Sequence, residues 1–215
     1  MSREEFVERV AAVSPEALSP SSLGALYAHY AELLRWNERL GLIGPGTEGE
    51  IIVRHYGESL AALRLIPDSA ATAVDLGSGA GFPGFVLAAA RPGLAMTLVE
   101  ARERKWSFLA AAARKAALPC HCLNARVATP LPAGLPEIID LVTVRALKLE
   151  RDVLGALARR LTPQGSVLIW AGERDPEVPP ELSPHASLCL AGGDRRRIVQ
   201  LRLARAADRE PANRS

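Results

Sequence analysis

Val74-Asp75-Leu76-Gly77-Ser78-Gly79-Ala80-Gly81-Phe82-Pro83-Gly84 is the most informative segment of the sequence. Apolar residues lead into an acidic side chain, four glycines follow, and a helix-forming run begins after the proline. A loop with so few side chains lets a ligand approach the backbone closely, and it aims the N-terminus of the next helix at that ligand. The stretch therefore predicts a strand, a ligand-binding turn and a helix.

Strand-like and helix-like segments alternate from residue 69 onward. The apolar patterns predict strands at residues 73–76, 95–99, 120–123, 138–144 and 166–170, and helices at residues 83–90, 103–117 and 150–161. No full helix separates the last two extended stretches, so we expect an antiparallel edge formed by residues 186–190 and 198–203. This order predicts an α/β, Rossmann-like fold with a mainly parallel, doubly wound sheet.

The first third of the chain shows helical patterns instead. A short helix is expected at residues 3–13, and Ser19 followed by Pro20 is a typical start for a second helix, which reaches residue 40. Thr47-Glu48-Gly49-Glu50 is a capping-box pattern and predicts a third helix reaching about residue 66. We expect three regions: an N-terminal helical extension (1–68), a ligand-binding domain (69–203) and a disordered tail (204–215).

Composition and charge limit the class of protein. At 215 residues with 48% hydrophobic and 23% charged side chains, the chain suits an ordinary globular protein. It has no apolar run that could span a bilayer, its charged N-terminus is unlike a signal peptide, and its three cysteines form no disulfide framework, so we expect a cytoplasmic protein. Residues 1–68 carry 6 basic and 10 acidic side chains, a balance of −4, whereas residues 69–215 carry 20 and 14, a balance of +6. The basic excess of residues 69–215 has two explanations, a polyanionic partner or an ordinary solvated surface, and charge alone does not distinguish them.

The glycine loop matches two known patterns. Residues 79–84 fit G-x-G-x-x-G, the dinucleotide fingerprint, with Glu100 where a ribose-binding acid is expected. That match begins three residues beyond the strand's Leu76, whereas a dinucleotide turn follows its strand at once. Asp75 followed by G-x-G-x-G is in better register, and it resembles the motif of class I S-adenosylmethionine-dependent methyltransferases. The resemblance implies that Asp75 lies near the methionyl end of the cofactor and that Glu100 binds its ribose hydroxyls.

The class of methyl acceptor can also be narrowed. The chain lacks the N/D-P-P-Y/F motif usual in enzymes that methylate exocyclic amines, and Cys120 is badly placed for the nucleophile that pyrimidine-carbon methylation needs. We expect Cys120 and Cys122 on one strand face with His121 on the other, which argues against a metal site. Arg145 ends the fourth strand and presents a cation at the switch-point crevice.

Several other segments carry short motifs: Trp36-Asn37 with Leu40-Gly41-Leu42, the segment from His55 to Leu60, Glu100 with Arg104-Lys105, Asn124-Ala125-Arg126, Val144-Arg145-Ala146 and Gly193-Asp194-Arg195. Together with the loop and its Phe-Pro-Gly end, they resemble the RsmG/GidB family, the bacterial 16S rRNA guanine-N7 methyltransferases, over residues 20–203. The chain departs from the family pattern at Gly41 (Asn in the family), Glu58 (Asp) and Ala171 (Lys), and the last change most affects the expected acceptor side.

The resemblance implies the residues of the site. The cofactor, S-adenosylmethionine, would be bound by Asp75, Gly77, Gly79, Gly81, Phe82, Glu100, Val127, Ala128 and Arg145. The RNA-facing rim would comprise Arg104, Lys105, Arg126 and Arg145, although a surface or salt-bridging role is the alternative for each arginine. The tract 195–197 is interpreted as a solvated entry to a strand. The implied partner is 16S rRNA or the small ribosomal subunit, and we expect a monomer that binds neither metal nor membrane.

The expected chemistry is methyl transfer to guanosine N7. This nitrogen has an available lone pair and no proton to lose, so no general base and no catalytic acid–base residue is expected. Two alternatives remain open: a class I methyltransferase of another RNA or a small molecule, and a catalytically weak RNA- or ribosome-binding relative. An NAD-binding oxidoreductase is a more distant alternative.

Overall fold

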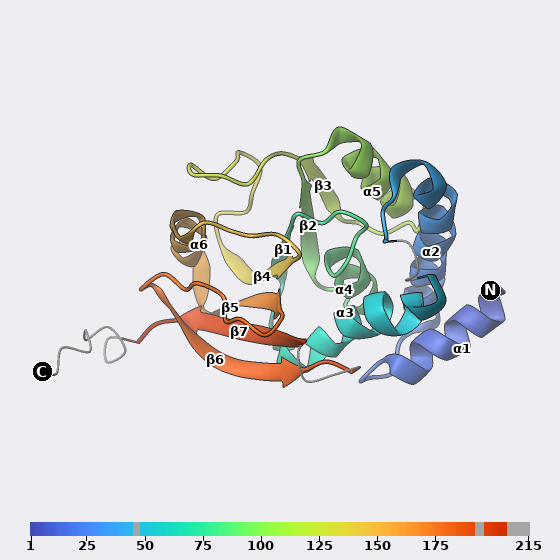
Figure 1. The fold of residues 1–215 in the computed structure, drawn as a ribbon, viewed down its shortest axis with the longest axis horizontal. Helices are drawn as coiled ribbons and strands as arrows, with labels where there is room; N and C mark the ends of the chain where they lie inside the picture. Colours follow the sequence, from blue (N-terminus) through green and yellow to red (C-terminus); the bar gives the residue numbers. More distant parts are fainter. Residues whose placement is uncertain (45–47, 192–195, 206–215) are drawn as a thin grey trace, which may run out of the picture.

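A seven-stranded sheet forms the centre of the molecule in the computed structural model, which describes residues 1–44, 48–191 and 196–205 (Figure 1). The strand order is β3-β2-β1-β4-β5-β7-β6. Strands β1 to β5 run parallel, and β7 lies antiparallel between β5 and β6. The strands are β1 (Thr72–Leu76), β2 (Ala95–Glu100), β3 (His121–Asn124), β4 (Ile139–Arg145), β5 (Leu161–Ala171), β6 (Leu182–Cys189) and β7 (Arg197–Leu203). The predicted Rossmann-like sheet with an antiparallel edge is therefore confirmed.

The strand order reverses between β1 and β4, which are direct neighbours although β2 and β3 intervene in the chain. Ligands of open α/β sheets bind at such a switch point, outside the carboxyl ends of the strands. The glycine loop follows β1 and Arg145 ends β4, so both lie at this position. The topology thus places the predicted site before any side chain is considered.

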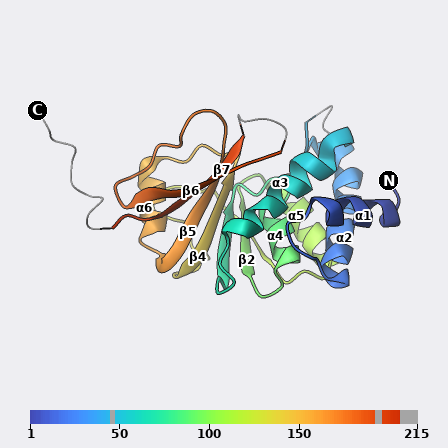
Figure 2. The same cartoon turned by 90° about the horizontal axis from the view of Figure 1, so that it is seen from below.

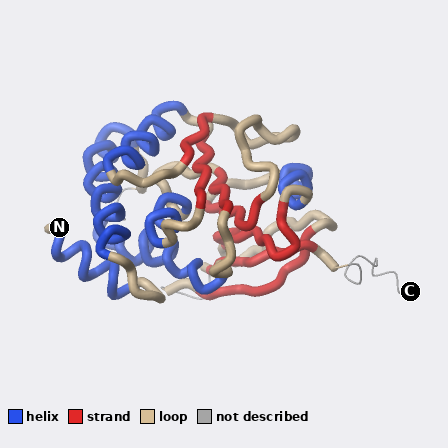
Figure 3. The backbone as a smooth tube through the Cα atoms, turned by 180° about the vertical axis from the view of Figure 1, so that it is seen from behind, coloured by secondary structure: helices blue, strands red, loops and turns tan. Residues whose placement is uncertain are grey.

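Helices cover the two faces of the sheet unequally (Figures 2 and 3). One face carries the helices of the N-terminal extension, α1 (Arg3–Val13) and α2 (Pro20–Leu40), with α4 (Gly84–Ala90) and α5 (Glu103–Lys115). The other face is covered by α6 (Arg151–Ala158). The extension shares one apolar core with the sheet, because Phe6 and Tyr56 belong to the same buried cluster as Leu98 of β2 and Leu141 of β4.

The segment from residue 48 to 65 differs from the single helix predicted there. It comprises a 3₁₀ turn (Glu48–Glu50), a π-helical turn (Ile52–Gly57), a short α3 (Glu58–Leu60) and a second 3₁₀ turn (Ala61–Leu65). A Cβ at Gly57 would lie 3.4 Å from the side chain of Val13, so the missing side chain lets α1 pack closely here. The capping residue Thr47 lies outside the described residues. Hydrophobic periodicity predicted a helical segment but could not distinguish these turns from regular α-helix.

Other predicted boundaries moved by a few residues. The cap at Ser19 is confirmed, because its hydroxyl accepts from the Ser22 N–H at 3.0 Å. Strand β5 begins at Leu161, five residues before the prediction, because Leu161 pairs with Ile139 before a register shift. Helix α6 ends correspondingly early, at Ala158. Among the described residues, no helix is long and apolar enough to cross a membrane.

Candidate functional site: a pocket at the glycine loop

The glycine loop folds back over the end of β1. Gly77, Gly79 and Gly81 have φ angles of 69°, 54° and 86°, a left-handed region that glycine adopts without strain. The N–H of Ser78 donates to the Val99 carbonyl at 3.0 Å, which fixes the loop to the neighbouring β2. The loop therefore presents main chain with few side chains toward the switch point, as the sequence predicted.

Two of the loop's glycines make room for protein side chains. A Cβ at Gly81 would lie 2.8 Å from Nε2 of His29, and a Cβ at Gly84 would lie 2.4 Å from Cβ of Asp75. Such contacts are too short for any side chain. Gly81 does not line the pocket described below. Internal packing is thus a sufficient reason for glycine at these two positions.

Asp75 lies beneath the loop and does not line the pocket. Its side chain is 1% exposed, and Oδ1 accepts from the Thr143 hydroxyl of β4 at 2.7 Å. Burial raises the pKa of Asp75 to about 6, although its hydrogen bonds lower it. Oδ2 has no hydrogen-bond partner among the described residues. Contact between Asp75 and the cofactor remains a prediction, and what the geometry adds is a link between β1 and β4.

Glu100 ends β2 and faces the loop directly. Its Oε2 accepts from the Gly79 N–H at 2.9 Å, and its Oε1 accepts from the Arg102 N–H at 2.8 Å. Each carboxylate oxygen has a second lone pair, so both can still accept from two vicinal hydroxyls. The carboxylate is thereby held in one orientation, and its contact with a ribose remains a prediction.

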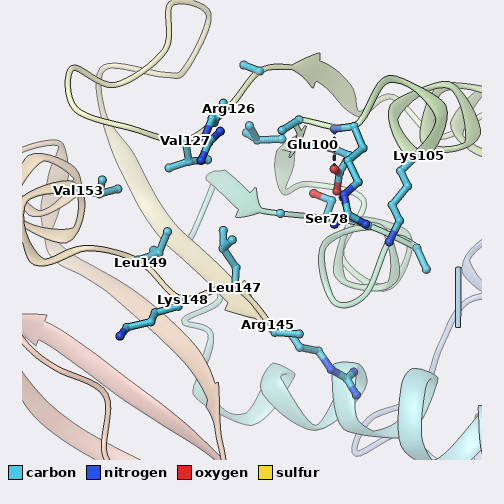
Figure 4. Close-up of a pocket in the computed structure, with 18 of the residues that line it drawn as sticks. Ser78, Glu100, Lys105, Arg126, Val127, Arg145, Leu147, Lys148, Leu149 and Val153 are labelled. Carbon is cyan, nitrogen blue, oxygen red and sulfur yellow. Dashed lines mark hydrogen bonds between the residues drawn. The ribbon is translucent and has the colours of Figure 1, made fainter. Parts of the chain in front are cut away.

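A pocket of about 680 Å³ opens beside the loop, a volume in the range of small-molecule sites (Figure 4). It is lined by most of the residues predicted for the cofactor and the rim: Gly77, Gly79, Phe82, Glu100, Lys105, Arg126, Val127, Ala128 and Arg145. Arg104 does not line it. Sequence reasoning missed Leu42, Ile43 and His55 from the extension, and Arg102, Leu147 and Lys148. For Leu42 and His55 the signal was present, because both residues belong to motifs quoted from the sequence.

Arg145 is held on the side of the pocket away from Glu100 (Figure 4). Its Nη2 donates to Oε2 of Glu58 at 2.7 Å and to the carbonyl of Arg54 at 2.8 Å. Glu58 is 4% exposed and also pairs with Arg196. Arg145 therefore lines the pocket and also forms an ion pair. From the sequence, a site role and a salt-bridging role were alternatives.

The interpretation of residues 195–197 as a solvated strand entry is wrong for Arg196, whose partner is buried. It is not contradicted for Arg197, which begins β7 and has the exposed Asp175 as its partner. Arg196 pairs with the buried Glu58, and Arg197 pairs with Asp175 at 2.6 Å. Both carboxylates are distant in sequence, so no local pattern could reveal the pairs. Arg195 lies outside the described residues.

His55 forms an aromatic wall together with Phe82. The two rings stack with centroids 4.9 Å apart and planes 25° apart. Burial, together with Arg145 and Arg54, lowers the pKa of His55 to about 4, so its imidazole is neutral near pH 7. Its Nε2 is buried without a hydrogen-bond partner in the described part of the chain.

Four cations line the pocket without forming an ion pair among the described residues: Arg102, Lys105, Arg126 and Lys148. They come from segments after β2, β3 and β4, whose carboxyl ends meet at one edge of the sheet. A positively charged rim around the pocket follows from this topology.

The site suits S-adenosylmethionine better than a dinucleotide. Glu100, Val127 and Ala128 could hold a ribose and an adenine, which both cofactors contain, so they do not distinguish the two. The distinction comes from the position of the helix that follows the loop. The helix after the loop, α4, begins at Gly84, beyond the pocket-lining residues 77–80 and 82. In the dinucleotide motif the N-terminus of this helix binds the pyrophosphate directly at the turn. Here the helix begins too far from the pocket lining to bind a pyrophosphate in that way.

Several solved structures with a similar fold are methyltransferases. A SAM-dependent methyltransferase from Aquifex aeolicus superposes with a TM-score of 0.53 at 17% identity, covering 81% of this chain and 98% of that chain. A ribosomal protein L11 methylase from Lactobacillus delbrueckii subsp. bulgaricus superposes with a TM-score of 0.53 at 11% identity, covering 71% and 79%. At these identities the likeness shows the fold, that of a class I SAM-dependent methyltransferase.

Sequence relatives are closer. The ribosomal RNA small subunit methyltransferase G of Cereibacter sphaeroides is 41% identical over 166 residues, which cover 73% of this chain and 76% of the relative. That of Sorangium cellulosum is 36% identical over 183 residues, covering 84% and 76%. The family model described as GidB, rRNA small subunit methyltransferase G, matches residues 23–190. This chain therefore belongs to the GidB family of rRNA small subunit methyltransferases.

Proposed function

We propose that this protein transfers a methyl group from S-adenosylmethionine to N7 of a guanosine in the 16S rRNA of the small ribosomal subunit. The observation that carries the proposal is the pocket in which the open glycine loop meets a pre-oriented Glu100. Around it lies a rim of cations that form no ion pair within residues 1–44, 48–191 and 196–205. Membership of the GidB family and the names of its relatives support the substrate class. We further propose that the protein acts as a soluble monomer in the cytoplasm.

The bound cofactor supplies an electrophilic methyl group on a cationic sulfur. The protein residues then have to align the guanine and keep water away, because N7 has no proton to remove. Phe82 and His55 provide a stacked aromatic wall, and Leu42 and Ile43 add apolar surface from the extension. With its low pKa, His55 remains neutral near pH 7 and adds no charge beside the guanine, which becomes cationic on methylation.

RNA would approach along the cationic rim. Arginine and lysine side chains contact phosphates and fix the register of a nucleic acid, whereas contacts with base edges decide which base is accepted. An unpaired or looped guanosine can turn its base into a pocket, since RNA recognition favours splayed bases. Arg102 and Lys105 on one side and Arg126 on the other would then bind the flanking phosphates.

Other cations lie near Ala171, the position where the family pattern has a lysine. Ala171 lines a neighbouring pocket of about 360 Å³, which is also lined by Lys148 and Arg174. Lys148 lines the cofactor pocket as well, so it stands between the two. We infer that Lys148 or Arg174 places a cation where the family pattern has the lysine of the fifth strand, and that the acceptor side keeps its charge.

The decisive experiment is transfer of label from radioactive S-adenosylmethionine to small ribosomal subunits that lack the modification, followed by mapping of the labelled nucleotide. Label on guanosine N7 is the expected result. Label on another acceptor would replace the proposed substrate, and cofactor binding without transfer would favour a binding protein.

Glu100→Gln should weaken cofactor binding about tenfold or more, because a charged acceptor of two ribose hydroxyls is lost. Glu103→Gln, an exposed change three residues away, should not alter binding.

A further inference from the structure

A buried histidine connects the helical extension to the glycine loop. His29 of α2 is fully buried, with Nε2 2.9 Å from the carbonyl oxygen of Ala80 and Nδ1 2.8 Å from the hydroxyl of Tyr56. Neither His29 nor Tyr56 lines the cofactor pocket, and both belong to residues 1–68. The mechanism proposed above makes no use of either side chain.

The hydrogen bonds determine which ring nitrogen carries the proton. A carbonyl oxygen only accepts, so Nε2 must donate to Ala80, and Nδ1 must then accept from the Tyr56 hydroxyl. Burial lowers the pKa of His29 to about 4, so the imidazole stays neutral near pH 7. Both nitrogens are satisfied in this single arrangement, which fixes the orientation of the ring.

The ring also fills the space behind the loop. It stacks on Phe85 with centroids 4.4 Å apart and meets Phe82 edge-on with centroids 5.3 Å apart. It occupies the space where a side chain of Gly81 would lie. His29 therefore contacts residues 80, 81, 82 and 85 in sequence, which form the second half of the loop and the start of α4.

The same loop is held from its other side by Glu100, which accepts from the Gly79 N–H. The Gly79 N–H lies in the peptide group between residues 78 and 79, and the Ala80 carbonyl lies in the one between residues 80 and 81. The peptide group between Gly79 and Ala80 is therefore flanked by one that a pocket residue fixes and one that a residue of the extension fixes. A change in the bond to His29 must alter the Ala80 peptide, and with it the main chain that faces the cofactor.

We propose that His29, supported by Tyr56, is a positioning residue for the cofactor: it holds the loop in the conformation that binds S-adenosylmethionine, so the extension completes the cofactor pocket. The proposal rests on the proposed function only for the identity of the cofactor. It concerns binding and requires no assumption about the methyl acceptor.

The test is the dissociation constant for S-adenosylmethionine, measured by calorimetry on the full chain without RNA. His29→Phe keeps the stacking on Phe85 but can neither donate to Ala80 nor accept from Tyr56, and should raise the Kd about tenfold. His29→Gln can still donate to Ala80 and should recover most of the affinity. Tyr56→Phe removes only the supporting hydroxyl and should raise the Kd about threefold.

Two controls separate positioning from general stability. Tyr27→Phe removes a hydroxyl from α2, the helix that carries His29, and should leave the Kd for S-adenosylmethionine unchanged. Val10→Ala makes a cavity in the buried core of α1, and should lower Tm with no change in Kd. Wild-type Kd in a folded His29→Phe variant would overturn the proposal even if its Tm fell. If that variant does not fold, wild-type Kd in Tyr56→Phe would overturn it. Failure of the wild-type protein to bind the cofactor would instead overturn the proposed function.

Discussion

At the scale of single residues, the glycine motif was predictable but the reason for each glycine was not. The sequence predicted backbone left open for a ligand, and this interpretation suits Gly77 and Gly79, which line the pocket. Gly81 and Gly84 are glycines because His29 and Asp75 occupy the space of their side chains. His29 is 52 residues before Gly81 in the chain, and no local pattern can reveal such a contact. Sequence motifs show which residues occur, and only the packing distinguishes residues that face a ligand from residues that contact other parts of the protein.

Buried Asp75 and His29 should give opposite pH dependences of stability. Between about pH 4 and 6, folded Asp75 (pKa about 6) keeps a proton that the unfolded chain releases, so stability falls as the pH rises. In the same range, folded His29 (pKa about 4) lacks a proton that the unfolded chain binds, so stability falls as the pH drops. His55, whose pKa is also lowered to about 4, acts in the same direction as His29. Each group contributes at most roughly 1.4 kcal/mol per pH unit, so Asp75 offsets about one of the two histidines.

Asp75→Asn should therefore expose the histidine contribution. We expect its free energy of unfolding to decrease on acidification from pH 6 to 4.5 more steeply than that of the wild type, by roughly 1.4 kcal/mol per pH unit. Urea titrations followed by tryptophan fluorescence at several pH values measure this. The exposed Glu103→Gln variant should run parallel to the wild type. Parallel curves for Asp75→Asn would show that Asp75 does not titrate as described.

At the scale of elements, the turns of residues 48–65 carry the least predictable part of the site. They bring Glu58 between the ends of β4 and β7, where it pairs with Arg145 and Arg196. Glu58 and Arg196 are 138 residues apart in the chain. Periodicity predicted most strands and helices to within a few residues, but not the mixed turns of residues 48–65. Ion pairs between elements depend on tertiary packing, which periodicity does not encode.

Glu58→Gln should destabilise the protein by about 2–4 kcal/mol, because it leaves two arginines close together without their buried anion. Glu58→Asp, which restores the residue of the family pattern, keeps the charge and should cost less. Chemical denaturation at pH 7 measures both. The matched control is Glu50→Gln, which breaks an exposed pair with Arg54 and should change stability by less than about 1 kcal/mol. Equal effects of Glu58→Gln and Glu50→Gln would contradict a buried structural ion pair.

At the scale of the whole molecule, the sheet topology gathers basic side chains from separate segments around one pocket. The sequence showed only that residues 69–215 carry the basic excess. Parallel strands end at one edge of the sheet, so segments after β2, β3 and β4 bring Arg102, Lys105, Arg126 and Lys148 around one pocket. The fold class was predictable because alternating elements dictate the sheet, whereas the share of the extension in the pocket depended on long-range packing.

If RNA lies along this rim, its affinity should depend on salt in proportion to the phosphates contacted. Loss of one phosphate contact lowers the slope of log K against log salt concentration by about 0.7–0.9. Arg126→Ala should produce a change of this size, and combining it with Arg102→Ala and Lys105→Ala should produce about 2–3. Binding of a 16S rRNA fragment over a series of salt concentrations measures the slopes. Lys115→Ala, at the far end of α5 and outside the pocket lining, should keep the wild-type slope. A reduced slope for Lys115→Ala with no change for Arg126→Ala would place the RNA on another face of the molecule.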